Sequence, residues 1–268
     1  MIQAVYNNTL EGLLVILAGV CSGAPLPDRI RRGVAPGGGQ GDLFGEAAPE
    51  APCPDRGWEI AGELFELSVN GYTHFIHGWM SELPLEAELV RFAARIIAQG
   101  RRSGGAQTTA GRRAADRALV GWGEPGHETV LAASRKVARE IDRMRGLLRF
   151  APNAQGVYTA RCAPDYGILP GLAGHFTRRF GPDPWAVIDE KRSLCLSGFP
   201  GREPLLLSVS AEAVASPDPW EALWRIYHQS IAIESRANSR LQRQWMPARY
   251  WRYLSEMRAG GPEPLPTT

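Results

Sequence analysis

The spacing of apolar residues changes near residue 147, and that change most constrains the fold. Before it, apolar residues recur every three or four positions, as on one face of a helix. The two stripes are Leu85, Leu89, Phe92, Ala93 and Ile96, then Val130, Val137, Ile141, Met144 and Leu148. After it, short runs alternate as strands do, at 147–151, 157–163, 185–189, 193–199 and 205–210, with a short helix at 168–180. This order predicts an α+β fold, a small, largely antiparallel sheet surrounded by helices.

The first residues predict a strand that leads directly into a helix. Ile2–Tyr6 alternates, and Asn8 with Glu11 three positions later is typical of a capping box that opens a helix over residues 9–21. The apolar run at 13–20 is too short to span a bilayer, and no Lys or Arg precedes it. We therefore expect a buried helix and no membrane association.

Composition divides the chain into four parts. Residues 33–57 are rich in Gly, Pro and Ala and cannot bury enough apolar surface to offset chain entropy, so they predict a flexible linker. We expect the strand and helix of residues 1–32 to pack on a main α+β domain at 58–258, followed by a disordered tail at 259–268. Within the main domain, a helical region at 58–99 should break near Pro84, and 100–111 reads as a loose stretch.

Charge and cysteine content exclude few functions. The net charge is +2, so only clustered charge could indicate nucleic-acid binding. All but two of the 30 basic residues are arginine, which a GC-rich genome also explains. The four cysteines are far apart and form no C-x-x-C pair, which argues against a zinc ribbon, an iron–sulfur cluster and a disulfide framework. We expect a cytoplasmic protein without a cofactor.

The stretch at 230–254 interleaves arginines with large aromatic residues. Asp218 and Pro219 predict the start of a helix before it, and a second helix should begin at Pro247. Arginines that contact phosphates, beside rings that stack on bases, form a nucleic-acid surface. The candidate residues are Arg236, Asn238, Arg240, Arg243, Arg249, Trp251 and Arg252. Alternatively, Trp245 and Trp251 are packing residues and the arginines pair with Glu234, Glu256 and carbonyl groups.

Two further features have a functional and a structural interpretation. The helix at 135–149 carries six basic residues, partly offset by Glu140 and Asp142, and is typical of a solvated face. Asp165, His175 and Asp189, with Arg178 and Lys191 nearby in sequence, could share an acid–base pocket, or serve as caps and ion pairs. His74 and His77 are one helical turn apart without a third ligand, so no metal site is predicted.

Gln40-Gly-Asp-Leu-Phe44 resembles the pentapeptide by which bacterial repair proteins bind the replication sliding clamp. Leu43 and Phe44 would enter an apolar pocket while Gln40 forms hydrogen bonds, and the segment would become ordered on binding. Gly41 departs from the usual Leu, which should weaken the contact.

Several blocks between Gly146 and Glu256 carry a family resemblance. They are Gly146-Leu-Leu-Arg-Phe150, Ala163-Pro-Asp-Tyr-Gly-Ile-Leu-Pro170, His175-Phe-Thr-Arg-Arg-Phe180, Trp185-Ala-Val-Ile-Asp-Glu-Lys-Arg192 and the closing Gln-x-Met-Pro-x-Arg-Tyr-Trp. The chain resembles a bacterial family assigned to DNA repair or DNA metabolism. That family accompanies a radical-SAM protein, and its domain also occurs fused to an iron–sulfur uracil-DNA glycosylase. Tyr6-Asn-Asn-Thr-Leu-Glu-Gly-Leu-Leu14 is similar to the family's N-terminal strand and helix.

The resemblance implies a DNA-repair accessory that acts with a radical-SAM partner, and the chain has neither the cysteine cluster of a radical-SAM enzyme nor a glycosylase domain. We expect it to bind DNA through the C-terminal arginine/aromatic face and not to be catalytic by itself. Two alternatives stay open: an enzyme that acts on nucleic acid or a nucleotide through Asp165, His175 and Asp189, and a scaffold that does not contact DNA.

Overall fold

The computed structural model describes residues 2–33, 54–120, 126–153, 155–209, 239–254 and 257. The chain divides into two compact units, residues 1–137 and 138–268, with the boundary inside a helix. This boundary differs from the one expected from composition, at 33–57. Most of that predicted linker, the helix start at Asp218 and the predicted tail at 259–268 lie outside the described residues.

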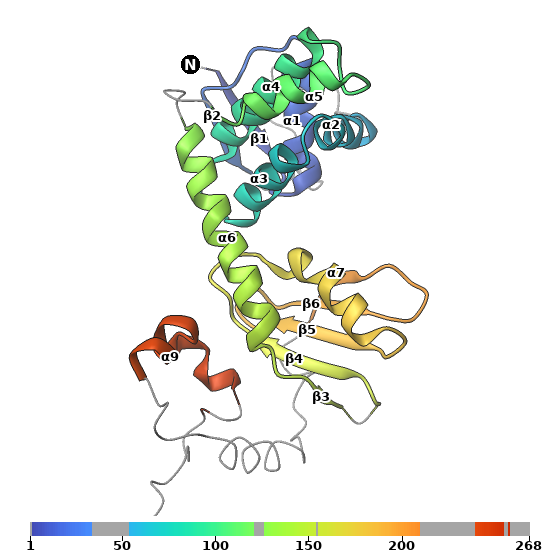
Figure 1. Ribbon diagram of the computed structural model, residues 1–268, viewed down its shortest axis with the longest axis vertical. Helices are drawn as coiled ribbons and strands as arrows, with labels where there is room; N and C mark the ends of the chain where they lie inside the picture. Colours follow the sequence, from blue (N-terminus) through green and yellow to red (C-terminus); the bar gives the residue numbers. More distant parts are fainter. Residues whose placement is uncertain are drawn as a thin grey trace, which may run out of the picture. The chain divides into compact units, whose positions relative to one another are not determined.

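The N-terminal unit is mainly helical, and Figure 1 shows its helices gathered together. Its elements are β1 Gln3–Tyr6, α1 Leu10–Cys21, β2 Arg29–Arg32, α2 Pro54–Leu67, α3 Val69–Met80, α4 Glu86–Arg102 and α5 Thr109–Arg117. β1 precedes α1 in the chain and β2 follows it, and the two strands pair in parallel. The core contains Leu13, Leu17, Leu64, Phe75, Leu89 and Ile96. The strand and helix of residues 1–32 thus pack on the helices that follow, and α1 lies against α2 and α4.

Helix ends in this unit differ from the prediction in three places. The cap of α1 is Thr9, whose Oγ1 accepts the Gly12 N–H at 3.1 Å, whereas Asn8 has a φ of 60°. The region 58–99 also breaks at Ser68, whose Oγ accepts the Gly71 N–H and caps α3. Gly100 lies inside α4 rather than in a loop, and its lack of a side chain leaves room for Leu67, since a Cβ there would come within 2.4 Å of the Leu67 side chain.

The C-terminal unit contains a five-stranded sheet in the order β3-β4-β5-β6-β7. The strands are β3 Ala151–Pro152, β4 Tyr158–Cys162, β5 Trp185–Asp189, β6 Leu194–Gly198 and β7 Leu205–Ser208. Only β4 and β5 pair in parallel, joined by α7 Leu169–Phe180; the other pairings are antiparallel. α7 packs on β5 and β6 (Figure 1). The rings of Phe176 and Phe180 lie against Trp185. The predicted α+β fold with a largely antiparallel sheet is confirmed.

α6 His127–Leu147 runs across the boundary between the units. The strand predicted at 147–151 is wrong for its first residues, because Leu147 and Leu148 are buried as a continuation of the α6 stripe. The last elements described are α9 Ser239–Trp245 and the 3-10 helix η3 Ala248–Tyr253. None of the described helices is both long and apolar enough to cross a membrane.

Candidate nucleic-acid interface

Helix α9 presents the most exposed aromatic side chain of the described C-terminal segment. Trp245, its last residue, is 66% exposed. Arg240 and Arg243 on the same helix are also exposed, and neither has an ion-pair partner among the described residues. An exposed indole on the same short helix as two such guanidinium groups can stack on a base while the arginines contact phosphates.

Trp251 lies in a different environment from Trp245. It is half-buried on η3, and its indole N–H donates to the Met246 carbonyl at 2.8 Å. The polar edge of this ring therefore fixes the turn between α9 and η3. Of the two tryptophans considered from the sequence, Trp245 is the one available for stacking.

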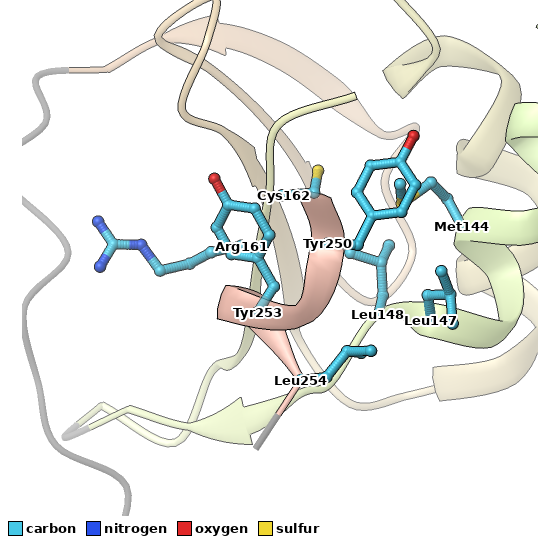
Figure 2. Close-up of a pocket in the computed structure, with 8 residues that line it drawn as sticks. All are labelled: Met144, Leu147, Leu148, Arg161, Cys162, Tyr250, Tyr253 and Leu254. Carbon is cyan, nitrogen blue, oxygen red and sulfur yellow. The ribbon is translucent and has the colours of Figure 1, made fainter. Parts of the chain in front are cut away.

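η3 is fixed to the rest of the C-terminal unit by buried side chains. Tyr250 is 2% exposed and Leu254 is fully buried. Figure 2 shows that they line a small pocket together with Tyr253. Its other walls come from the end of α6, the residue that follows it, and β4: Met144, Leu147, Leu148, Arg161 and Cys162. The pocket has room for little more than a water molecule, so it serves packing and cannot accommodate a base.

A buried carboxylate, Glu140 of α6, joins three segments of this unit. Its Oε1 and Oε2 accept the backbone N–H groups of Asp165 and Tyr166, each at 2.9 Å, and the Tyr250 hydroxyl donates to Oε1. Burial, with Glu140 as the next cause, raises the pKa of Tyr250 well above its usual range. Because a buried carboxyl group requires such hydrogen-bond donors, Glu140 fixes both the loop after β4 and η3.

The arginines of η3 contact acidic and aromatic groups of the protein itself. Arg249 Nη2 lies 2.7 Å from Asp165 Oδ2, and its guanidinium stacks over the Tyr250 ring at 4.6 Å. Arg252 stacks over Tyr253 and lies 3.9 Å from Glu190. Both are partly exposed, but their charge is shared with carboxylates, so phosphate contact is less available to them than to the arginines of α9.

The residues predicted for acid–base chemistry are not brought into one pocket. Asp189 is fully buried and accepts the backbone N–H groups of Lys191 and Arg192 and the Arg192 guanidinium at 2.8 Å. Arg192 also donates to the Asp165 carbonyl at 2.9 Å, as does Lys191 Nζ. The side chains of Lys191 and Arg192 thus connect the Asp189 turn to the Asp165 backbone. Both carboxylates already have cationic partners, Arg249 for Asp165 and Arg192 for Asp189.

His175 of α7 has no hydrogen bond to either aspartate in the described structure. Its ring packs edge-on against Phe176. Partial burial, followed by Arg145, Arg179 and the exposed Arg178, lowers its pKa. An imidazole among arginines, with neither aspartate beside it, is poorly placed as a general acid at neutral pH. No group of three His, Cys, Asp or Glu side chains in the described ranges could hold a metal ion.

Sequence reasoning missed the role of Glu140, which it treated as an offset to surrounding basic residues. Helical spacing carried a signal, since Glu140 falls on the buried stripe between Val137, Ile141 and Met144. A carboxylate on such a stripe requires donors from other segments. Among the predicted residues, Arg236, Asn238, Gln40, Leu43 and Phe44 lie outside the described residues, so the sliding-clamp motif stays a prediction.

A family model described as a domain of unknown function (DUF4130) matches residues 110–256, more than half of the chain. Neither the comparison with curated proteins nor that with solved structures returned a match. The matched range includes α6, the sheet, α7, α9 and η3, and therefore the Glu140 contacts that join them. The chain belongs to the family of the domain of unknown function DUF4130.

Proposed function

We propose that this protein is a DNA-repair or DNA-metabolism accessory that binds nucleic acid through α9 and acts with a radical-SAM partner. The observation that carries the binding proposal is that the short helix α9 exposes the indole of Trp245 and the guanidinium groups of Arg240 and Arg243, which no carboxylate in the described parts of the chain neutralises. The radical-SAM partner rests on the family resemblance of the sequence blocks between Gly146 and Glu256.

Within this proposal, α9 makes the contacts and η3 holds α9 in place. Stacking of one base on an aromatic ring contributes about 1–3 kcal/mol, and phosphate contacts of arginine add a salt-dependent term. Arg249 and Arg252 stabilise η3 through Asp165 and Glu190. Because exposed rings reach unpaired bases more readily than paired ones, single strands are the expected form.

The test is binding of a fluorescent single-stranded oligonucleotide, measured by anisotropy across a series of salt concentrations. Arg240→Ala/Arg243→Ala should weaken binding and lower the slope of log affinity against log salt by about 0.7 for each phosphate that the protein no longer neutralises. Trp245→Ala should weaken binding by about 1–3 kcal/mol and leave the slope unchanged.

Matched controls come from the N-terminal unit. Arg113→Ala/Arg117→Ala removes two exposed positive charges from α5, and Trp58→Ala removes another half-exposed indole. Both should leave affinity and slope unchanged. If the α5 pair lowers the slope as much as the α9 pair, binding follows overall charge, and the α9 site is wrong.

A further inference from the structure

Helix α2 carries a second apolar surface that the described residues of its own unit do not cover. Its buried face is formed by Ile60, Ala61, Leu64 and Leu67. Trp58 and Phe65, two turns apart on another side, are 46% and 49% exposed, and Val69 at the start of α3 is 56% exposed. The Phe65 and Tyr72 rings pack nearly perpendicular to each other with their centroids 5.4 Å apart, which orients the Phe65 ring. Apolar side chains in a row on the solvent side of a helix are typical of a binding surface.

The exposed side chains of Trp58 and Phe65 form an apolar ridge along α2, and Gly62 leaves a hollow between them. It lies one turn from both Trp58 and Phe65, is exposed, and a Cβ there would meet nothing within 4 Å. Glycine inside a helix is destabilising relative to alanine, and no contact within the described unit requires it. Its position between two large side chains leaves space for the close approach of another backbone.

A row of carboxylates borders the ridge. At 100° per residue, Asp55, Glu59 and Glu66 lie side by side on α2, next to Gly62 and away from the buried face. All three are exposed, and Glu59 and Glu66 have no ion-pair partner in the described parts of the chain. The surface is therefore apolar along one line and acidic along the next.

We propose that this face of α2 binds a basic amphipathic helix of a partner protein. The apolar stripe of such a helix would pack between Trp58 and Phe65 over Gly62, and its Lys or Arg residues would lie along Glu59 and Glu66. The acidic row disfavours the two other occupants. It repels phosphates of a nucleic acid, and in a symmetric pair of copies it would oppose carboxylates to carboxylates.

The test uses the full chain and a labelled helical peptide of leucine and lysine in amphipathic order, with anisotropy as the readout. Glu59→Lys/Glu66→Lys should weaken binding at least about tenfold and should make a leucine/glutamate peptide bind instead. Gly62→Gln fills the hollow and should weaken binding about tenfold or more, as blocking the centre of an interface does, while thermal stability stays equal or rises.

The matched control is Gly146→Gln, at another exposed helical glycine whose Cβ would also meet nothing within 4 Å. This variant should bind the peptide like the unchanged protein, as should Trp245→Ala. The proposal is overturned if the leucine/lysine peptide does not bind, if a scrambled peptide of the same composition binds equally well, or if Gly62→Gln has no more effect than Gly146→Gln.

Discussion

At the scale of single residues, Glu140 organises the C-terminal unit. It occupies a position where helical spacing demands an apolar side chain, yet its carboxylate has four partners within reach: two backbone N–H groups, a tyrosine hydroxyl and, at 3.9 Å, Arg249. A buried carboxylate is tolerated only when its hydrogen-bonding capacity is filled. Through these contacts, the Glu140 side chain connects α6 to the loop after β4 and to η3.

Loss of this carboxylate should be costly. Glu140→Ala leaves one buried and two partly buried donors without their acceptor, so we expect the free energy of unfolding to fall by about 3 kcal/mol. Glu140→Gln retains one acceptor oxygen and should be less destabilising. Urea denaturation measures both.

Asp142→Ala is the control for this experiment, since Asp142 lies on the same helix but is exposed and its ion pair with Arg145 lies at the surface. Its effect should stay below about 1 kcal/mol. Equal decreases for Glu140→Ala and Asp142→Ala would show that the Glu140 contacts do not stabilise the fold.

At the scale of elements, η3 is a short 3-10 helix whose stability comes from docking, because so few backbone hydrogen bonds cannot sustain it alone. Tyr250 is its main anchor. Since burial and Glu140 raise the pKa of Tyr250, the folded protein disfavours the phenolate. The resulting stability is fully present below the unfolded-state pKa, about 10, and is lost as the pH rises through the higher folded-state pKa.

We therefore expect the free energy of unfolding to decrease above a pH of about 10, and to decrease less steeply in Tyr250→Phe. Part of the pH dependence of stability should remain in that variant, because the pKa of Tyr6 is raised to about 12 and that of Tyr253 is raised as well. Denaturation curves across the alkaline range provide the measurement. Identical pH dependence in the variant and the unchanged protein would contradict the anchoring role of Tyr250.

Elements with strong local signals were predictable from the sequence. β5 at 185–189 and α7 have regular alternation or a clear apolar stripe, and the structure has them within one residue of the prediction. β2 was missed, because Arg29-Ile-Arg-Arg contains one apolar residue and owes its strand conformation to pairing with β1. α5 was missed altogether, because its Thr108 cap follows a glycine-rich stretch.

The candidate site was less predictable than the fold. Periodicity correctly put Tyr250 and Leu254 on one face, and both are buried. It could not reveal that Arg249 would meet Asp165, because that contact joins residues 84 positions apart through tertiary packing. For the same reason, the exposure of Trp245 and the partial burial of Trp251 depended on side-chain contacts that spacing alone does not specify.

At the scale of the whole molecule, the small net charge of +2 is the sum of acidic and basic surfaces that lie on different elements. In the N-terminal unit, α2 has an apolar ridge bordered by carboxylates. In the C-terminal unit, α9 has two exposed arginines and an exposed indole. Such a division suits an adaptor that binds nucleic acid with one surface and a basic protein helix with another. It also predicts that charge changes on one surface leave binding at the other unchanged.

Photochemical crosslinking tests the central claim, binding through α9, most directly. A single-stranded oligonucleotide carrying 5-bromodeoxyuridine is irradiated with the full chain, and the crosslinked residue is mapped by mass spectrometry. We predict that the crosslink falls on Trp245 and disappears in Arg240→Ala/Arg243→Ala but is kept in Arg113→Ala/Arg117→Ala. Crosslinks confined to residues outside α9, unchanged by the α9 substitutions, would contradict the account.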